Sequence, residues 1–294
     1  MRIGIQLPQW GRAASREAIL RIARLAETAG FDSVWASDHV VYPLDAPADY
    51  PYNVDRTPPF TPEDGYLEVL TTLAVVAGAT ERIRLGTSVL ILPMRNILLT
   101  AKVVSTLDVL SSGRVTLALS AGWWQGEFEA LGQNFEQRGP RFDEQLVVLR
   151  DLWTNGRAAA EGKNVNFSTV VSEPKPIQPG GPDLWIGGRG KRVWARIARS
   201  NVRGWHGIGH DRESIGSAQV AIAAACTEHK RDFSTVGFST ATGMPTTAEK
   251  ILSRIGALTT ANVDQVVFIP RGDDLDSILG SIDLFGSSVK PKLS

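Results

Sequence analysis

Two hydrophobic periods alternate along this chain. Short runs rich in β-branched and aliphatic residues are each followed by a longer stretch whose apolar positions recur at helical spacing. The predicted strands cover residues 2–7, 33–36, 84–89, 115–119, 184–186, 204–207, 238–241 and 263–269. The predicted helices cover residues 16–29, 68–80, 97–110, 142–153, 191–199, 212–230, 248–258 and 275–285. This alternation is typical of βα units that build a parallel sheet.

The first predicted helix has a cap signal at each end. Ser15 stands at the N-cap position, and Gly30 stands where a left-handed C-cap residue is expected. Between them, one stripe of the helix is apolar and charged residues occupy the rest of its surface. The stripe consists of Ile19, Ile22, Ala23, Ala26 and Ala29.

Eight βα units favour a closed (β/α)8 barrel of the TIM type, because open doubly wound sheets more often stop at five or six strands. The length of 294 residues fits one such domain over residues 1–294. Two segments interrupt the alternation. Residues 40–65 are rich in proline and lack a period, and residues 154–182 contain two strand-like runs, 165–167 and 169–171, that suggest a β-hairpin. We expect both as long insertions at the C-terminal face, where barrels build their active sites.

Charge and cysteine content exclude several classes of protein. The chain has 31 basic and 31 acidic side chains, so the basic excess of a nucleic-acid-binding protein is absent. Its one cysteine, Cys226, can form neither an internal disulfide nor a thiolate metal cluster, and is expected in the core. Neither a targeting segment nor a membrane-spanning run is found, so we expect a cytoplasmic protein.

Tryptophans accumulate near the expected carboxyl ends of the strands. Of the eight, six fall in or just after predicted strands: Trp10, Trp35, Trp123, Trp124, Trp185 and Trp205. Indole rings at a barrel mouth would line an apolar pocket suited to a flat ligand. Simple core packing is the alternative for any one of them.

Polar side chains follow the second predicted strand directly. Asp38 supplies two hydrogen-bond acceptors, and His39 can exchange a proton near neutral pH. Catalytic groups of barrel enzymes come from this position, after the end of a strand. A turn cap and an exposed histidine are the alternative interpretation of the pair.

A glycine-rich turn joins the fifth predicted strand to its helix. Gly187 and Gly188 precede Arg189, and backbone N–H groups in such a turn can approach a phosphate. Residues 184–210 contain six basic side chains and no acidic one. The spacing is neither that of a P-loop nor that of the dinucleotide fingerprint.

Two further kinds of site are not expected. His206 and His210 stand four residues apart, but no carboxylate nearby completes a metal site. The G-x-S-x-G motif of serine hydrolases is absent.

Five blocks in this order make the chain similar to luciferase-like monooxygenases, in the branch of coenzyme F420-dependent oxidoreductases. The blocks are Ser37-Asp38-His39, Arg82 to Leu90, Ala101 to Arg114, Gly122 to Gly132 and Trp185 to Arg189. The resemblance implies a (β/α)8 barrel, a homodimer, a small-molecule substrate, and a flavin or deazaflavin bound across the barrel mouth.

The resemblance also implies roles for single residues. His39 and Asp38 match family positions near the ring system, with His39 the catalytic candidate and Asp38 a cofactor contact. Ser88 and Val89 match the pair that forms a non-proline cis peptide bond beside the ring. Three residues, Ala121, Gly122 and Trp123, match the loop that contacts the cofactor after the fourth strand. Gly187, Gly188 and Arg189 match the phosphate side.

Trp123 departs from the pattern, because the sugar-phosphate dehydrogenases of the branch carry an acidic residue there. The resemblance therefore predicts hydride transfer between coenzyme F420 and a small, apolar substrate rather than a sugar phosphate. Two alternatives stay open at this point. One is an FMN-dependent monooxygenase, and the other is a non-catalytic cofactor-binding protein whose pocket is blocked by Trp123 and Trp124.

Overall fold

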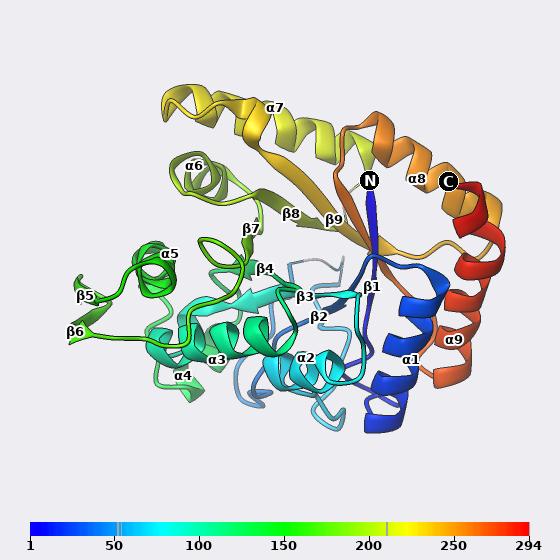
Figure 1. Cartoon of the computed structure of the whole chain (residues 1–294), viewed down its shortest axis with the longest axis horizontal. Coiled ribbons are helices and arrows are strands. Elements are labelled where there is room, and N and C mark those ends of the chain that lie inside the picture. The colour runs from blue at the N-terminus through cyan, green and yellow to red at the C-terminus, as the bar shows by residue number, and fades with distance from the viewer. Residues whose placement is uncertain (52, 54, 210, 294) are drawn as a thin grey trace.

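Eight parallel strands close a barrel in the part of the chain that the computed structural model describes, residues 1–51, 53, 55–209 and 211–293. β1 pairs in parallel with β2 on one side and with β10 on the other, which closes the ring (Figure 1). The barrel strands are β1 (Arg2–Gln6), β2 (Ser33–Ala36), β3 (Arg84–Ile91), β4 (Val115–Ser120), β7 (Asp183–Gly187), β8 (Gly204–Ile208), β9 (Gly237–Gly243) and β10 (Gln265–Ile269). The predicted (β/α)8 barrel is confirmed.

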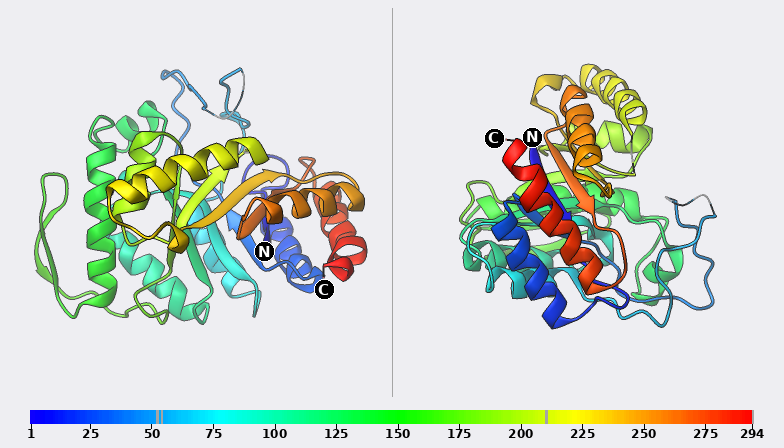
Figure 2. Two further views of the ribbon diagram at one scale, coloured as in Figure 1. Left: turned by 90° about the horizontal axis from the view of Figure 1, so that it is seen from above. Right: turned by 90° about the vertical axis from the view of Figure 1, so that its right-hand side faces the viewer.

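Helices cover the outside of the strands (Figures 1 and 2). They are α1 (Arg16–Ala29), α2 (Val69–Ala77), α3 (Ile97–Leu110), α4 (Gln125–Ala130), α5 (Arg138–Thr154), α6 (Lys191–Arg199), α7 (Arg212–Glu228), α8 (Ala248–Thr260) and α9 (Leu275–Leu284). Short helical turns span Leu92–Met94, Phe233–Thr235, Phe285–Val289 and Lys290–Lys292. The expected caps of α1 are present, with Ser15 accepting from the Ala18 N–H and Gly30 at φ 84°. The sequence patterns did not predict α4.

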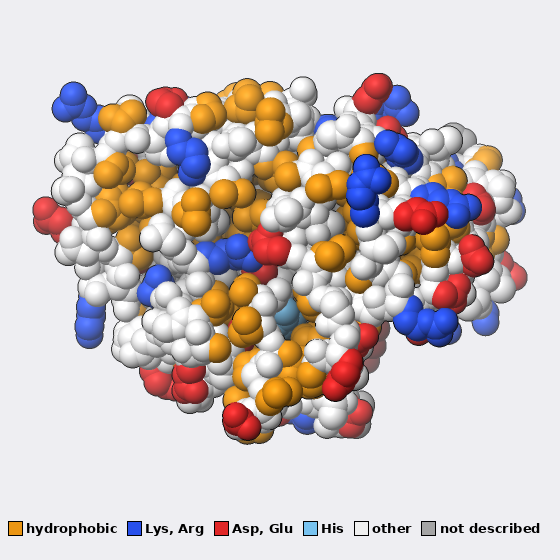
Figure 3. All heavy atoms as spheres, turned by 90° about the horizontal axis from the view of Figure 1, so that it is seen from below, with side chains coloured by type: hydrophobic (Ala, Val, Ile, Leu, Met, Phe, Trp, Pro, Cys, Tyr) orange, Lys and Arg blue, Asp and Glu red, His pale blue; other side chains and the backbone are white. Residues whose placement is uncertain are grey.

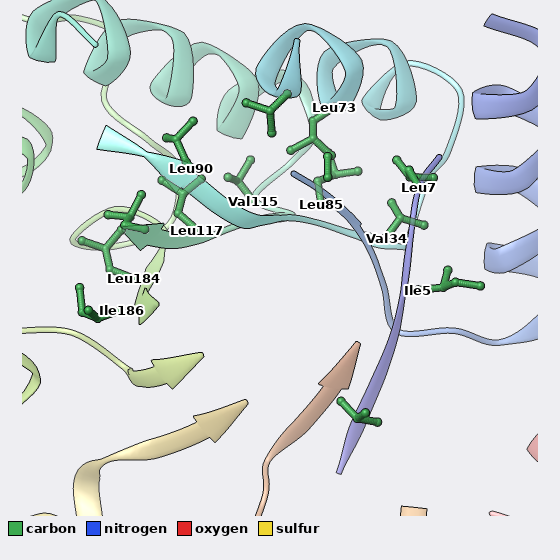
Figure 4. Packing of buried hydrophobic residues seen from close by; sticks show 14 of the residues in the cluster. Ile5, Leu7, Val34, Leu73, Leu85, Leu90, Val115, Leu117, Leu184 and Ile186 are labelled. Carbon is green, nitrogen blue, oxygen red and sulfur yellow. The ribbon is translucent and has the colours of Figure 1, made fainter. Parts of the chain in front are cut away.

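The hydrophobic core has two layers. Aliphatic side chains of the strands meet those of the helices outside the barrel, as Leu85, Leu90 and Leu117 do in Figure 4. A second cluster fills the barrel interior and includes Trp35 and Trp185. Gly86 makes room for the Trp35 ring, since a Cβ at this glycine would lie 2.4 Å from the ring.

The position expected for residues 154–182 is wrong. This segment follows helix α5 and precedes β7, so it joins the amino-terminal end of the barrel and not the C-terminal face. The side-chain amide nitrogen of Gln178 donates to the carbonyl of Val115, the first residue of β4, over 2.8 Å. A helix of a βα unit runs antiparallel to its strands, so an insertion after a helix starts at the end of the barrel opposite the mouth.

The hairpin itself is present, but its strands differ from those expected. Residues 165–167 and 169–171 fall largely within one strand, β6 (Asn166–Val170), whose antiparallel partner is β5 (Ala158–Glu161). Glu144 of α5 holds the connecting turn, because its carboxylate accepts from the backbone N–H groups of Asn164 and Val165, both over 2.8 Å. The alanine-rich β5 carries no strand signal, so a tertiary anchor decides the pairing.

Among the described helices, none combines the length and the apolar character needed to cross a bilayer.

Candidate active site

A pocket with a cavity volume of about 100 Å³ lies where several barrel strands end. Most of its walls are aromatic or aliphatic, and polar groups face it at a few points. The lining residues are Trp10, Ser37, Asp38, His39, Tyr50, Pro59, Phe60, Tyr66, Ser88, Val89, Ile91, Ser120, Trp123 and Ile208. Figure 3 shows a hollow in this molecule in which a histidine side chain is framed by hydrophobic side chains. This composition is typical of a small-molecule site.

Residues 40–65 form part of the pocket wall, as expected for the first insertion. Tyr50, Pro59 and Phe60 come from this segment, and Figure 2 shows it extending beyond the barrel. The Arg189 guanidinium donates to the Pro51 carbonyl over 3.2 Å, which ties the segment to the loop after β7. The insertion thus links the pocket wall to the loop after β7.

His39 is held by a buried carboxylate. Its Nδ1 lies 3.0 Å from Oε2 of Glu127 in α4, and the Glu127 side chain is 1% exposed. The other oxygen of Glu127 accepts from the Val40 N–H over 2.6 Å. The Nε2 atom of His39 has no hydrogen-bond partner in the described residues. A carboxylate on one ring nitrogen fixes the orientation of a histidine and leaves the other nitrogen for proton exchange.

Aromatic rings surround this histidine. Phe60 lies 4.8 Å, Tyr66 5.5 Å and Trp123 5.8 Å from the centre of the imidazole, all tilted or edge-on. Trp124 stacks on Trp123 at 5.1 Å and is buried, so it does not line the pocket. These rings leave His39 in a site with few competing polar groups.

The carboxylate of Asp38 is already bound to other residues. It accepts from the Ile91 N–H over 2.9 Å and from the Arg95 guanidinium over 2.6 Å. Burial raises the pKa of the Asp38 carboxyl, and both partners oppose this effect. Its hydrogen bonds therefore hold the loop after β3 against the loop after β2, beside His39.

A second buried group, Gln9, connects the loops after β1 and β2. Its side-chain oxygen accepts from the Ser37 N–H, and its amide nitrogen donates to the Leu67 carbonyl over 3.1 Å. The Ser37 hydroxyl lies 2.5 Å from the Tyr66 hydroxyl, and burial raises the pKa of Tyr66. Gln9, Ser37 and Tyr66 thus shape the pocket wall next to His39.

Ser88 and Val89 lie where β3 passes the pocket, and the peptide bond between them is cis, as the resemblance implied. The Ser88 hydroxyl is 2.8 Å from Nε2 of the buried His206. Val89 packs toward β7, where a Cβ on Gly187 would lie 2.8 Å from its Cγ1 atom. Both residues lie in the pocket wall.

Trp123 lines the pocket, whereas Ala121 and Gly122 lie in the loop between β4 and that tryptophan. Gly122 has φ 85°, a conformation that favours glycine. Gly187 ends β7, and the turn 188–190 leads from it into α6, at the same end of the barrel. Gly188 and Arg189 are not part of the lining of this pocket, and Arg189 instead borders a separate surface groove with Trp194.

Only some of the six mouth tryptophans face the pocket. Trp10 and Trp123 line it. Trp35 and Trp185 fill the barrel interior, which is a correction of the expected position. Trp205 packs outside the barrel against Trp194, with ring centres 5.5 Å apart. Alternate residues of a strand face opposite sides of the barrel wall, so position along the chain does not decide which tryptophans reach the mouth.

The described residues contain no cluster of three or more potential metal-ligating side chains. His206 contacts two serine hydroxyls, Ser88 and Ser239. His210 lies outside the described residues.

The sequence patterns missed Glu127, Gln9 and Tyr66 as site residues. Glu127 stands 88 residues from His39, and Gln9 stands 28 residues from Ser37. Glu127 lies in the block Gly122 to Gly132 that carries the family resemblance, whereas Gln9 and Tyr66 lie in none of the five blocks, and only the closed barrel shows that these residues meet His39 and Ser37.

Comparison with known proteins matches residues 1–253 to the family of luciferase-like monooxygenases. An uncharacterized protein of Mycobacterium tuberculosis is 31% identical over 193 residues, which make up 65% of this chain and 66% of that protein. The FMNH(2)-dependent dimethylsulfone monooxygenase of Pseudomonas fluorescens is 25% identical over 256 residues, which make up 85% of this chain and 63% of that enzyme. Each match thus spans slightly less than two thirds of the relative's own length.

Two solved structures share the fold from end to end. The monooxygenase RslO1 from Streptomyces bottropensis superimposes with a TM-score of 0.80 at 18% identity and covers 100% of both chains. An F420-dependent secondary alcohol dehydrogenase superimposes with a TM-score of 0.81 at 17% identity and covers 100% of this chain and 99% of its own. The family match extends over most of the sequence and the barrel agrees with it, so the chain belongs to the luciferase-like monooxygenase family.

Proposed function

We propose that this protein is an oxidoreductase that transfers a hydride between coenzyme F420 and a small, apolar organic substrate, with His39 as the group that moves the accompanying proton. The observation that carries the proposal is the pair of His39 and Glu127 in an apolar pocket. Glu127 orients the imidazole through Nδ1 over 3.0 Å, while Nε2 lacks a partner in the described residues. An oriented imidazole in a pocket of this kind is a general acid or base.

Two sets of residues at this end of the barrel match the two parts of such a cofactor, an apolar set in the pocket for the ring and the start of α6 for a phosphate. Trp10, Val89 and Ile91 provide apolar contact area for a ring. Among the described residues, no side chain caps the start of α6 after Gly190, and its first turn holds no acidic residue, so this end of the helix suits an anion. We assign Gly187, Gly188 and Arg189 to this phosphate side.

When bound, a deazaflavin supplies a ring carbon that carries a hydride and moves two electrons together. The residues of this chain have three other tasks. The aromatic walls exclude water and hold the substrate, and the hydrogen bonds of Asp38 fix the loop that carries His39. As an alcohol is oxidised, its carbon loses a hydride and its oxygen loses a proton, and the proton passes to Nε2 of His39; the reverse reaction returns it.

The first test measures cofactor binding and turnover separately. Titration of the purified protein with F420 and with FMN, followed by fluorescence quenching, should show tight binding of F420. His39→Ala should keep this affinity within about threefold and lower kcat by about 10²- to 10⁴-fold. His229→Ala is the matched control, because His229 caps α7 and is exposed. Unchanged turnover in His39→Ala would remove His39 from the mechanism.

The second test identifies the substrate class. Oxidation of reduced F420 is followed with a panel of enones, imines, ketones and nitroaromatic compounds. Turnover of one class supports the proposal. Tight F420 binding without reduction or oxidation by any partner would favour the non-catalytic alternative.

One observation favours a second candidate, an FMNH2-dependent monooxygenase. The dimethylsulfone monooxygenase of Pseudomonas fluorescens, named as FMNH(2)-dependent, is 25% identical over 256 residues. The fold and the apolar pocket serve both reactions. Tight FMN binding with no affinity for F420, together with oxygen consumption by the reduced complex, would replace the first candidate by this one.

A further inference from the structure

Four side chains form a line of hydrogen bonds from the barrel interior to the pocket. The Gln265 amide nitrogen donates to the Ser239 hydroxyl over 3.1 Å. The Ser239 hydroxyl lies 2.9 Å from Nδ1 of His206, and Nε2 of His206 lies 2.8 Å from the Ser88 hydroxyl. Gln265, Ser239 and His206 are buried, whereas Ser88 lines the pocket. The cofactor reaction proposed above makes no use of this line.

The imidazole in the middle of the line is neutral. His206 stacks on Trp35 with ring centres 5.3 Å apart, and no carboxylate contacts it among the described residues. Burial lowers the pKa of His206 from 6.5 to about 3. At neutral pH one ring nitrogen therefore carries a hydrogen and the other accepts one.

The buried hydroxyl of Ser239 decides which nitrogen carries the hydrogen. If Nδ1 carried it, Ser239 would accept from both Gln265 and His206, and its own hydrogen would have no acceptor in the described part of the chain. If Nε2 carries it, Ser239 donates to Nδ1 and His206 donates to Ser88, so the hydroxyl hydrogen that the described residues leave without an acceptor is that of Ser88, which faces the pocket. Buried polar groups are seldom left without partners, so the second arrangement is favoured.

We propose that His206 is held as the Nε2–H tautomer and donates to Ser88, which fixes the Ser88 hydroxyl as a hydrogen-bond donor into the pocket. The Ser88 oxygen accepts from His206, so its own hydrogen points to other acceptors, and the described residues offer none. Ser88 thus selects ligands that present a carbonyl oxygen or an unprotonated ring nitrogen. The identification of that ligand as a flavin or deazaflavin rests on the function proposed above, whereas the tautomer does not.

The tautomer is measured directly on the wild-type protein. With ¹⁵N-labelled histidine, multiple-bond ¹H–¹⁵N correlation spectra distinguish Nε2–H, Nδ1–H and doubly protonated rings. The His206 signals are those that disappear in His206→Gln; if that variant does not fold, they are those that shift in Ser239→Ala. We expect the Nε2–H pattern, unchanged between pH 5 and 8. An Nδ1–H pattern or a doubly protonated ring would overturn the proposal.

A variant of Gln265, at the buried end of the line, tests in which direction the hydrogen bonds are donated. Gln265→Glu is nearly isosteric, but the new carboxylate accepts where the amide donates. Ser239 should then donate to this carboxylate, and the His206 pattern should change to Nδ1–H. A folded variant that keeps the Nε2–H pattern would show that Gln265 does not set the direction, contrary to the proposal.

Ligand binding tests the donor at the pocket. Ser88→Ala should weaken the binding of F420, or of FMN if FMN is the cofactor, roughly three- to tenfold, the size expected for one hydrogen bond. Thr87→Val is the matched control, because the Thr87 hydroxyl donates to the Ala118 carbonyl and does not line the pocket. Equal affinity of Ser88→Ala and wild type would overturn the proposal. If the wild type binds neither cofactor, the proposed function fails, and the tautomer pattern alone decides the donor assignment.

Discussion

Glu127 uses its two carboxylate oxygens for different partners. One oxygen accepts from the Val40 backbone over 2.6 Å and anchors the start of the segment 40–65, and the other holds Nδ1 of His39 over 3.0 Å. Its side chain is 1% exposed, so this charge-assisted bond is shielded from water. The same residue therefore positions a loop and a proton-exchanging ring.

We predict that Glu127→Gln impairs catalysis through His39. The amide keeps the size of the side chain, but when its oxygen stays on Val40 its nitrogen donates to Nδ1 of His39 and forces the hydrogen onto Nε2. We expect kcat to fall about 10- to 100-fold and the pH–rate profile to shift, with KM changed by less than about threefold. Steady-state kinetics between pH 5.5 and 9 measure both effects.

The control for this variant is Glu129→Gln, in the same helix. Glu129 is exposed and contacts Gln125, not His39. Equal kinetics of the two variants would show that Glu127 does not act through His39.

The elements of this barrel meet closely at the carboxyl ends of β3 and β7. Gly187, the last residue of β7, has no side chain, and Val89 occupies the space beside it. A methyl group at this glycine would approach Val89 to 2.8 Å, so one of the two strands must move or Val89 must turn toward the pocket. The contact between these two strands thus controls the width of the pocket.

We predict that Gly187→Ala disturbs the contact between β3 and β7. The extra methyl group overpacks this contact, which typically costs about 1–3 kcal/mol. The protein can respond by losing stability, by narrowing the pocket, or by both. We expect a lower Tm and weaker binding of the ring cofactor. Calorimetry and fluorescence titration measure the two. Gly256→Ala serves for comparison, because a Cβ there meets no atom within 4 Å; a similar loss of affinity in both variants would contradict the prediction.

Element prediction succeeded where a local pattern carries the information. Helices α3 and α6 begin and end at the predicted residues 97–110 and 191–199. The apolar stripe of each helix, and the Asn96 cap of α3, lie within one short segment. The prediction failed for α4, which has six residues, and for β5, which pairs because Glu144 holds the adjoining turn.

For the whole molecule, barrel closure determines the state of His206. Strand β8 turns this histidine inward, where Trp35 covers it and water is excluded. The folded protein therefore keeps the ring neutral down to about pH 3, whereas the unfolded chain binds a proton near pH 6.5. The contribution of this lowered pKa to the free energy of unfolding is fully present above pH 6.5. It is lost progressively as the pH falls from 6.5 toward 3.

We therefore predict that the free energy of unfolding of His206→Gln falls less steeply than that of the wild type as the pH is lowered below 6.5. Each pKa unit corresponds to about 1.4 kcal/mol, so the wild type should lose about 2 kcal/mol from this group between pH 6.5 and pH 5. Urea unfolding at a series of pH values measures the difference between the two proteins. His229→Gln is the surface control and should follow the wild type; parallel curves for wild type and His206→Gln would show that His206 does not contribute.

The chain's linear pattern was sufficient for the number of βα units, the barrel and the segment 40–65 at the pocket. It also placed His39 among the candidate residues, because the C-terminal ends of parallel strands share one edge, and the family resemblance added Val89. Ring closure and side-chain packing settled the rest. They join Glu127 to His39, bond Asp38 to Arg95, turn Trp35 inward and link His206 to Ser88. These contacts join residues far apart in the chain, and a pattern of period 2 or 3.6 holds no information on which of them meet.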